Sequence, residues 1–545
     1  MVESGTGDSL GGNHGSLVAP DLLAIGIWAL VAGWLAIERV NFNGDGLRHI
    51  APILAGSHPS LGEARWLLFP AVLFAAIKPL QNIGLVDSVE QAAHVFVALD
   101  LLAGLAYLFL LRRWLIARSI KPTARAAALF FASMCRPLLE YPSNTVEPII
   151  AAAVALAGVV YLASQPSERK ERALAVAAIA LCLATLIYQG MLLAIALVPC
   201  ALGDRLRLRR QSIAIFFLLL AAAPLTMFSA IVMSGHPPRA ALHQMLTGEA
   251  NDLYKAEMKS RTRTVWPYFA AVTVGPAENI IPIPDNRGLS GAVRLVVDRA
   301  ATGEGLLELT GIVFSFALLL VGAGIVARNR DWRIAVAFCG ILILPLLRSF
   351  QYSYTKFYVL MPAIVALVFS TVTPFLVLVA GAVVGVFNTV YIGRDIIAER
   401  RLASDINPLF GMVDPDSCYL TTSWSAPTMK WPGSTCSLNS ILSNDSADQP
   451  TAIAQFNRQA LIGSLRRCFC GSPLVLTDDL IAANSDSLAE FSSIYGLPRG
   501  AMNVILWQPD RGTVFFDHDD LRVFAYSKPA QAAICANLKT LAPGQ

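Results

Sequence analysis

Charged residues are scarce in this chain of 545 residues. They make up 15% of the sequence, whereas hydrophobic residues make up 55%. Soluble domains carry roughly 25% charged residues, so this composition excludes water as the main solvent of the protein. The net charge of +4 is too small to indicate a nucleic-acid partner, and the basic residues fall in short clusters between apolar stretches. A protein embedded in membrane lipids is therefore expected.

Basic residues are absent from the first twenty positions, which contain Glu3 and Asp8. Because a cleavable signal peptide needs a basic segment before its apolar core, the first apolar stretch is expected to remain as an anchor. The chain also lacks an internal repeat, and it has no P-loop, GxGxxG, HExxH or GxSxG motif in a suitable context. The common nucleotide-binding, metalloprotease and hydrolase signatures are thus not represented.

Apolar stretches of spanning or near-spanning length recur up to residue 393. The stretch 173–203 is too long for one span, and Tyr188-Gln189-Gly190 at its middle predicts two short helices joined by a tight turn. In total the sequence predicts a polytopic α-helical membrane protein with about eleven transmembrane helices. The other predicted spans cover residues 21–37, 93–111, 124–139, 148–164, 213–233, 305–327, 334–347, 355–372 and 374–393.

Clusters of Lys and Arg in short loops set the predicted orientation, because such loops stay in the cytoplasm. This rule gives a transmembrane domain over 1–399 with outer loops at 38–92 and 234–304, and a C-terminal domain over 400–545 outside the cytoplasm. The expected location is a bacterial inner (cytoplasmic) membrane. The basic clusters are Arg112, Arg113, Arg118, Lys121 and Arg125; Arg169, Lys170 and Arg172; Arg205, Arg207, Arg209 and Arg210; and Arg328, Arg330 and Arg333.

The side on which the first loop lies depends on residues 65–83. Their charge-free apolar core, Leu67 to Ile77, is eleven residues long and contains Pro70. Segments of this length are more often interfacial or re-entrant than spanning. We interpret the stretch as interfacial, which places Asp45 outside the cytoplasm. If 65–83 spans the membrane instead, Asp45 is cytoplasmic.

Residues 400–545 are richer in charge, Ser and Asn, and their short apolar runs predict a small α/β domain. In an oxidising compartment its five cysteines would form up to two disulfides and leave one thiol over. Asp517-His518-Asp519-Asp520 is interpreted as a polar hairpin turn, with a metal site as the alternative. The cysteines are Cys418, Cys436, Cys468, Cys470 and Cys535; the predicted strands are Cys418–Leu420, Pro473–Thr477, Asn503–Trp507 and Leu521–Tyr526, with helices near 450–467 and 478–495.

Polar residues gather in three turns on the predicted outer face. In the first turn Asp45 lies between Gly44 and Gly46, where a ligand can approach closely. A carboxylate there can act as a base and a nearby Arg can hold a phosphate, although an Asp-Gly turn can also merely join two segments. Single Arg and Tyr residues at span ends often anchor the interface, but three converging turns favour function. The candidates are Asp45, Arg48, His49, His58 and Glu63; Arg136, Glu140 and Asn144; and Arg348, Tyr354 and Lys356.

Three features carry a resemblance to a known class. They are Asn43-Gly44-Asp45-Gly46 after the first span, the segment Lys356-Phe357-Tyr358-Val359-Leu360-Met361-Pro362 at the start of a late span, and the overall plan of spans and outer domain. With these, the chain resembles the GT-C class of polyprenyl-phosphate-sugar-dependent, integral-membrane glycosyltransferases. No carboxylate lies two residues from Asp45, so the paired-acid motif of the metal-dependent members is absent. No metal or other cofactor is predicted.

The resemblance implies a sugar donor on a polyprenyl phosphate and a glycan, lipid or protein acceptor in the cell envelope. Asp45 would take the proton of the acceptor hydroxyl, and Arg48, Arg348 and Lys356 would contact the leaving phosphate, with inversion at the anomeric carbon. No protein partner is indicated. The residues expected to contact substrate are His49, His58, Glu63, Glu140, Asn144 and Tyr354.

Other functions fit the same composition. A transporter or flippase of a lipid-linked or small substrate would need polar or broken-helix sites near the bilayer midplane, and the break at Tyr188-Gln189-Gly190 is the feature that favours it. An envelope polysaccharide polymerase or ligase would use outer Arg and His without an essential Asp. A scaffold would only display the C-terminal domain. Replacement of Asp45 separates the glycosyltransferase from these three.

Overall fold

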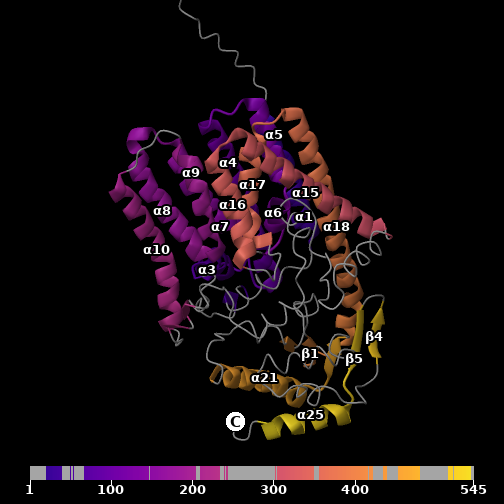
Figure 1. Ribbon diagram of the computed structural model, residues 1–545. Coiled ribbons are helices and arrows are strands. Elements are labelled where there is room, and N and C mark those ends of the chain that lie inside the picture. The colour runs from indigo at the N-terminus through magenta and orange to yellow at the C-terminus, as the bar shows by residue number, and fades with distance from the viewer. Residues whose placement is uncertain are drawn as a thin grey trace, which may run out of the picture.

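A computed structural model shows a helical bundle joined to a smaller α/β part by one long helix (Figure 1). The residues that the structure describes are 20–39, 50, 53–54, 67–145, 148–203, 209–233, 238–239, 241–242, 301, 303–348, 355–414, 416–421, 434–437, 452–478, 514–518 and 521–541.

In this described part, helices occupy the predicted spans. Four of them are long and apolar enough to cross a membrane, as judged by length and composition. They are α1 (Pro20–Glu38), α4 (Val89–Ala117), α10 (Arg210–Met233) and the stretch Pro374–Ile397 of α18 (Pro374–Met412). The total of about eleven spans stays a prediction. The remaining helices of the bundle are α3 (Phe69–Asn82), α5 (Pro122–Met134), α6 (Arg136–Glu140), η2 (Tyr141–Ser143), α7 (Pro148–Ser164), η3 (Ser167–Arg169), α8 (Lys170–Ile187), η4 (Gln189–Leu197), α9 (Val198–Leu202), α15 (Gly303–Asn329), α16 (Trp332–Arg348), η5 (Thr355–Leu360) and α17 (Met361–Phe369).

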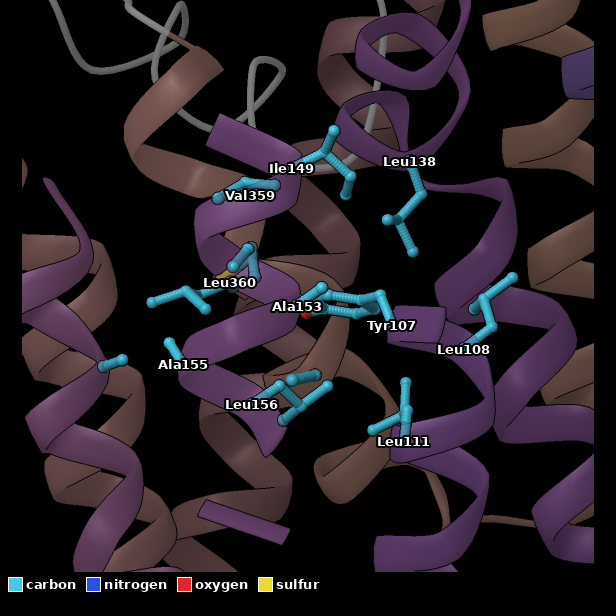
Figure 2. Packing of buried hydrophobic residues seen from close by; sticks show 14 of the residues in the cluster. Tyr107, Leu108, Leu111, Leu138, Ile149, Ala153, Ala155, Leu156, Val359 and Leu360 are labelled. Carbon is cyan, nitrogen blue, oxygen red and sulfur yellow. The ribbon is translucent and has the colours of Figure 1, made fainter. Parts of the chain in front are cut away.

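The predicted break at Tyr188 is confirmed. α8 ends at Ile187, Tyr188 has extended backbone with φ −146° and ψ 115°, and the 3₁₀ helix η4 begins at the next residue. Apolar runs without a polar face form the centre of the bundle. Figure 2 shows Tyr107 and Leu111 of α4 beside Ala153 and Leu156 of α7, two helices in extensive contact.

Small residues bring α7 and α8 close together. A Cβ atom at Gly158 of α7 would lie 2.6 Å from Cβ of Ala180 in α8, nearer than such atoms approach. Glycine and alanine allow this spacing, which maximises packing between helices where lipid supplies no hydrophobic driving force. The same composition therefore explains both the apolar character and the close packing of these helices.

The connection between α1 and α4 begins and ends at one end of the bundle. Asp21 in the first turn of α1 bonds Arg112 near the end of α4, so the two helices run antiparallel. Between them lies α3, whose 14 residues give a helix about 21 Å long, shorter than a bilayer core of about 30 Å. Its buried residues Phe69, Leu73 and Ile77 share one face. This arrangement agrees with a helix along the interface rather than a span.

The inner end of the bundle is the end at which Asp21, Arg112 and Arg125 meet, and the outer end is the end at which α1 stops at Glu38 and α6 lies. The predicted cytoplasmic clusters at Arg112–Arg125 belong to the inner end. The loop with Asp45 leaves α1 at the outer end.

The C-terminal part is an α/β domain, as the sequence predicted. Its five-stranded sheet has the order β2-β1-β3-β5-β4, with β1 parallel to β2 and β3, and β5 antiparallel to β3 and β4. Helices α21 and α25 pack on one face of the sheet, and the end of α18 packs on the other. The elements are β1 (Cys418–Thr421), β2 (Ser434–Ser437), α21 (Ala452–Gly471), β3 (Val475–Asp478), β4 (Val514–His518), β5 (Leu521–Ala525) and α25 (Lys528–Leu541).

Two disulfides and one remaining thiol confirm the cysteine prediction for this domain. Cys418 bonds Cys468, and Cys470 bonds Cys535, which ties α21 to β1 and to α25. Cys436 on β2 is a buried free thiol. Burial raises the pKa of the Cys436 thiol to about 12, so it remains protonated and unreactive near neutral pH.

The polar hairpin turn predicted at Asp517–Asp520 is confirmed, because His518 at the end of β4 pairs with Leu521 at the start of β5. Other details of this domain differ from the sequence prediction. Strand β2 and helix α25 were not predicted, and α18 continues through the predicted domain boundary at residue 399 to Met412. The predicted helix 478–495 and strand 503–507 lie largely or wholly outside the described residues.

Candidate functional site

The short helix α6 is the centre of the outer end. Cys135 has extended backbone with φ −63° and ψ 142°, which ends α5, and α6 then starts with a proline in its first turn. α6 packs against α1, η5 and α18, and Trp28 near the middle of α1 donates from Nε1 to the carbonyl of Leu138 at 2.7 Å. The turn predicted from Arg136 to Asn144 therefore meets α1, which leads into the Asp45 loop, and the segment that contains Lys356.

A buried ion pair lies within α6. Arg136 is 1% exposed, and its Nε lies 2.5 Å from Oε2 of Glu140, one helical turn away. The guanidinium carbon also lies 5.2 Å from the centre of the Tyr391 ring. A buried charge is tolerated only when it is paired and hydrogen-bonded, so both contacts compensate for the desolvation of Arg136.

Helix α18 presents a polar face to this pair. Asn388, Tyr391 and Asp395 follow one another at spacings of three and four, which places them on one side of the helix. Asn388 Nδ2 donates to the carbonyl of Met134 at 2.8 Å, one step before the kink into α6. Polar side chains are costly at membrane depth, so this face gains its stability from partners on α5 and α6.

Asp395 interacts electrostatically with four charged neighbours. They are Arg136, Glu140, Arg39 and Arg394, which come from α6, the end of α1 and α18 itself. Arg39 is also buried, at 6% exposure. Three cations and two carboxylates leave an excess of positive charge, and charges in a partly desolvated site interact more strongly than in water. This outer cluster, defined as Arg39, Arg136, Glu140, Arg394 and Asp395, favours the approach of an anion.

The predicted site residues differ in how the structure places them. Glu140 belongs to the outer cluster, whereas the Asn144 side chain accepts the backbone N–H of Thr145 at 2.8 Å, a contact that shapes the turn. Arg348 ends α16 and Lys356 lies in η5; only their backbone is described. The residues that lie outside the described part are Asp45, Arg48, His49, His58, Glu63 and Tyr354.

The outer cluster also limits how far Asp45 can lie from it. The chain leaves α1 through Arg39, a member of the cluster, and Asp45 follows six residues later. Because an extended chain spans at most about 3.6 Å per residue, Asp45 lies within about 22 Å of Arg39.

Several residues of this site escaped the sequence reasoning. Arg39, Tyr391 and Asp395 were not among the candidates, although Arg394-Asp395 at the end of a long apolar run is the kind of signal that marks function. Asp100 was missed as well; it is 0% exposed within α4. Among the described residues no group of three or more His, Cys, Asp or Glu side chains forms a potential metal site.

No family model and no curated protein matches the chain. Among solved structures it is similar to ArnT from Cupriavidus metallidurans, in the apo state and bound to undecaprenyl phosphate, at 13% and 14% identity, with a TM-score of 0.40 and coverage of 93% of this chain and 98% of that chain in both cases. It is also similar to the Archaeoglobus fulgidus oligosaccharyltransferase in complex with Zn and sulfate, at 11% identity and a TM-score of 0.44, over 88% of this chain and 70% of that chain. These TM-scores lie below 0.5, so the similarity carries no conclusion about function.

Proposed function

We propose that the protein is an integral-membrane glycosyltransferase of the GT-C class. It moves a sugar from a polyprenyl-phosphate carrier to a glycan, lipid or protein acceptor of the cell envelope. The observation that carries this proposal is that α6, with its Arg136–Glu140 pair, contacts η5 and α18, and that Asp395 of α18 interacts electrostatically with both Arg136 and Arg39, where the chain leaves α1 toward Asp45. The loop that starts there, α6 and η5 belong to the three chain segments in which the sequence predicts a base and phosphate contacts.

The proposed reaction needs a base and cations on opposite sides of the sugar. Asp45 accepts the proton of the acceptor hydroxyl while the hydroxyl oxygen bonds to the anomeric carbon. The bond from that carbon to the phosphate oxygen breaks, and the electron pair leaves on the lipid phosphate. Arg48, Arg348 and Lys356 stabilise this phosphate, and the positive excess of the outer cluster adds to their field. Attack opposite the leaving group inverts the anomeric configuration.

Two disulfides in the C-terminal domain support an extracytoplasmic outer end. Disulfides persist in oxidising compartments and are rare in the cytosol. The domain packs on the end of α18 through Leu409 and Val413, beyond the outer end of the bundle. The opposite end has the predicted cytoplasmic clusters of arginine. The donor would therefore be used on the leaflet that faces away from the cytoplasm.

One observation favours a transporter or flippase as the second candidate. Asp100 is a buried carboxylate within the long apolar helix α4, and such residues often mark a substrate or proton path. A flippase would move the lipid-linked substrate without breaking the sugar–phosphate bond. Transport by the wild-type protein in vesicles, lost in Asp100→Asn and unaffected by Asp45→Asn, would favour this alternative.

The test is sugar transfer by the purified protein from a panel of polyprenyl-phosphate sugars, with donor binding measured separately. Arg348→Ala and Lys356→Ala each remove a charge-assisted contact worth roughly 1.5–3 kcal/mol, so each should weaken donor binding by about 10- to 150-fold. Arg113→Ala, at an exposed position of the inner end, is the matched control and should bind donor as the wild type does. Unchanged binding in both outer variants would contradict the phosphate roles.

A further inference from the structure

Helix α18 joins the bundle to the C-terminal domain without a flexible linker. Its 39 residues give a length of about 58 Å, and the fifteen residues after the membrane-spanning stretch ending at Ile397 extend about 22 Å beyond it. Leu409 and Val413 at its end pack against Tyr419, Leu476 and Val523 of the sheet. Figure 1 shows α18 running from the bundle to the strands. Forces on this helix are thus transmitted to the domain.

Arg400 fastens the outer part of α18 to the end of α1. Its Nε donates to the carbonyl of Glu38 at 2.7 Å, and its Nη2 lies 2.7 Å from Oε2 of the same residue. Glu38 is the last residue of α1, where backbone carbonyls lack helical partners and the helix dipole favours a cation. Arg400 therefore satisfies an end carbonyl of α1 and neutralises the Glu38 carboxylate with one side chain.

A second pair of opposite charges lies near the first. Asp395, about one turn before Arg400 on α18, interacts electrostatically with Arg39, the residue after Glu38. Glu38 is thus bonded to α18, and the next residue lies in the field of a carboxylate on the same helix. The chain that continues from them is the loop with Asp45, which follows Glu38 after seven residues.

We propose that Glu38 and Arg400 are positioning residues that hold the start of the Asp45 loop and the C-terminal domain as one unit. The pair fixes the point where the loop leaves α1, and through α18 it fixes the domain relative to the same point. This mechanical link between the loop start and the domain, the tie, follows from the contacts of Arg400 with Glu38 alone. Its consequence for sugar transfer rests on the proposed function: the domain and the point at which the Asp45 loop begins keep a constant relative position while the acceptor is bound.

Hydrogen–deuterium exchange of the full-length protein in lipid nanodiscs tests the tie. Glu38→Lys turns the attraction into repulsion, so peptides covering residues 398–408 should exchange about five- to tenfold faster than in the wild type. Glu38→Lys combined with Arg400→Glu restores the ion pair with its signs exchanged but not the hydrogen bond to the residue 38 carbonyl, so it should restore part of the protection. Asp87→Lys makes the same charge change at an exposed outer-end position and should leave these peptides unchanged. Unchanged exchange in Glu38→Lys, or no recovery in the double variant, would overturn the tie.

Sugar transfer tests the consequence. Glu38→Lys should lower kcat by about five- to tenfold while donor binding stays within twofold, and the double variant should recover part of the lost kcat. A purely stabilising contact would instead reduce the amount of folded protein and leave kcat of the folded fraction unchanged. If kcat is insensitive, the positioning role is wrong. If the wild type transfers no sugar while the exchange pattern holds, the proposed function fails and the tie remains.

Discussion

The two ends of the bundle use the same residue types in different ways. At the inner end Asp21 is 0% exposed and bonds two cations, Arg112 at 2.6 Å and Arg125 at 2.8 Å, which join α1, α4 and α5. At the outer end Arg136 pairs with Glu140 within α6, while Arg39 and Asp395 approach from other helices. The inner cluster joins three helices through one buried carboxylate. The outer cluster surrounds the place where a loop begins.

The other polar contacts at the inner end also join helices to one another. The Lys170 ammonium donates to the carbonyls of Ala201 and Leu202, which satisfies the end of α9, and Arg118 donates to the carbonyl of Cys200. These cations neutralise backbone groups that a helix end leaves without partners. An arginine-rich end of a helical bundle is therefore not by itself a functional site. What separates the outer end is the excess of positive charge around Arg39, the residue at which the chain leaves α1.

The largest expected effect concerns the side on which each end lies. A cysteine that replaces Ser57, in the first loop, should react with a membrane-impermeant thiol reagent added to intact cells. The extent of labelling should exceed that of the parent protein. A cysteine that replaces Arg113 at the inner end should react only after permeabilisation. The reverse pattern would place the Asp45 loop in the cytoplasm and exclude a donor used on the outer leaflet.

The next effect is on stability at the inner end. Asp21→Asn leaves two cations without their buried carboxylate, which should lower the free energy of unfolding by about 3–5 kcal/mol. Asp331→Asn is the matched control, because its partner Arg118 lies 3.7 Å away and both are partly exposed; it should cost less than about 1 kcal/mol. Denaturation followed in detergent compares them. Equal losses of unfolding free energy in the two variants would show that the Asp21 cluster does not hold α1, α4 and α5 together.

Disulfides at the outer end should contribute somewhat less. Cys470→Ser opens the bond to Cys535, which should destabilise the C-terminal domain by about 2–4 kcal/mol and make it sensitive to protease at lower urea. Cys339→Ser removes a free cysteine of α16 and should have no such effect. Mass spectrometry of protein purified without reductant should find Cys418 linked to Cys468 and Cys470 linked to Cys535; free thiols at these positions would contradict the oxidised state.

The smallest effect sharpens the functional contrast between the ends. Glu140→Gln removes the charge that pairs with buried Arg136, and should cost about 1.5–3 kcal/mol of stability as well as lower turnover in the folded fraction. Glu171→Gln at the inner end loses only the exposed contact with Arg209 and should change neither quantity measurably. Normal turnover of folded Glu140→Gln would reduce α6 to a structural element.

Much of the bundle could be predicted because membrane-spanning helices are recognised from the length and apolarity of their sequences. The break at Tyr188 and the short helix α3 followed from the same rule. The ion pairs of Asp21 could not be predicted, since Asp21 and its two partners lie 91 and 104 residues apart in the chain. Helices that are apolar all round carry no pattern to say which face meets which neighbour.

The C-terminal domain shows the same limit on a smaller scale. Apolar strands such as β1 and β3 were predicted, but β2 has the sequence Ser-Thr-Cys-Ser and no apolar alternation. The signal for α25 was present, with a proline in its first turn and Ala530, Ile534 and Leu538 spaced by four, and was overlooked. At the candidate site, residue type and turn position indicated Glu140, whereas the signal of Arg394-Asp395 at the end of an apolar run was overlooked and only the structure identified the charged neighbours of Asp395.

Replacement of Asp45 by asparagine tests the central proposal most directly. The substitution keeps size and hydrogen bonding but removes the proton-accepting charge, and general-base catalysis contributes typically 10²–10⁴-fold. Sugar transfer from a purified polyprenyl-phosphate donor should fall by about that factor, with donor binding unchanged and with Asp87→Asn, an exposed carboxylate at the same end, as active as the wild type. A correctly inserted Asp45→Asn protein with full transfer activity would contradict the proposed mechanism.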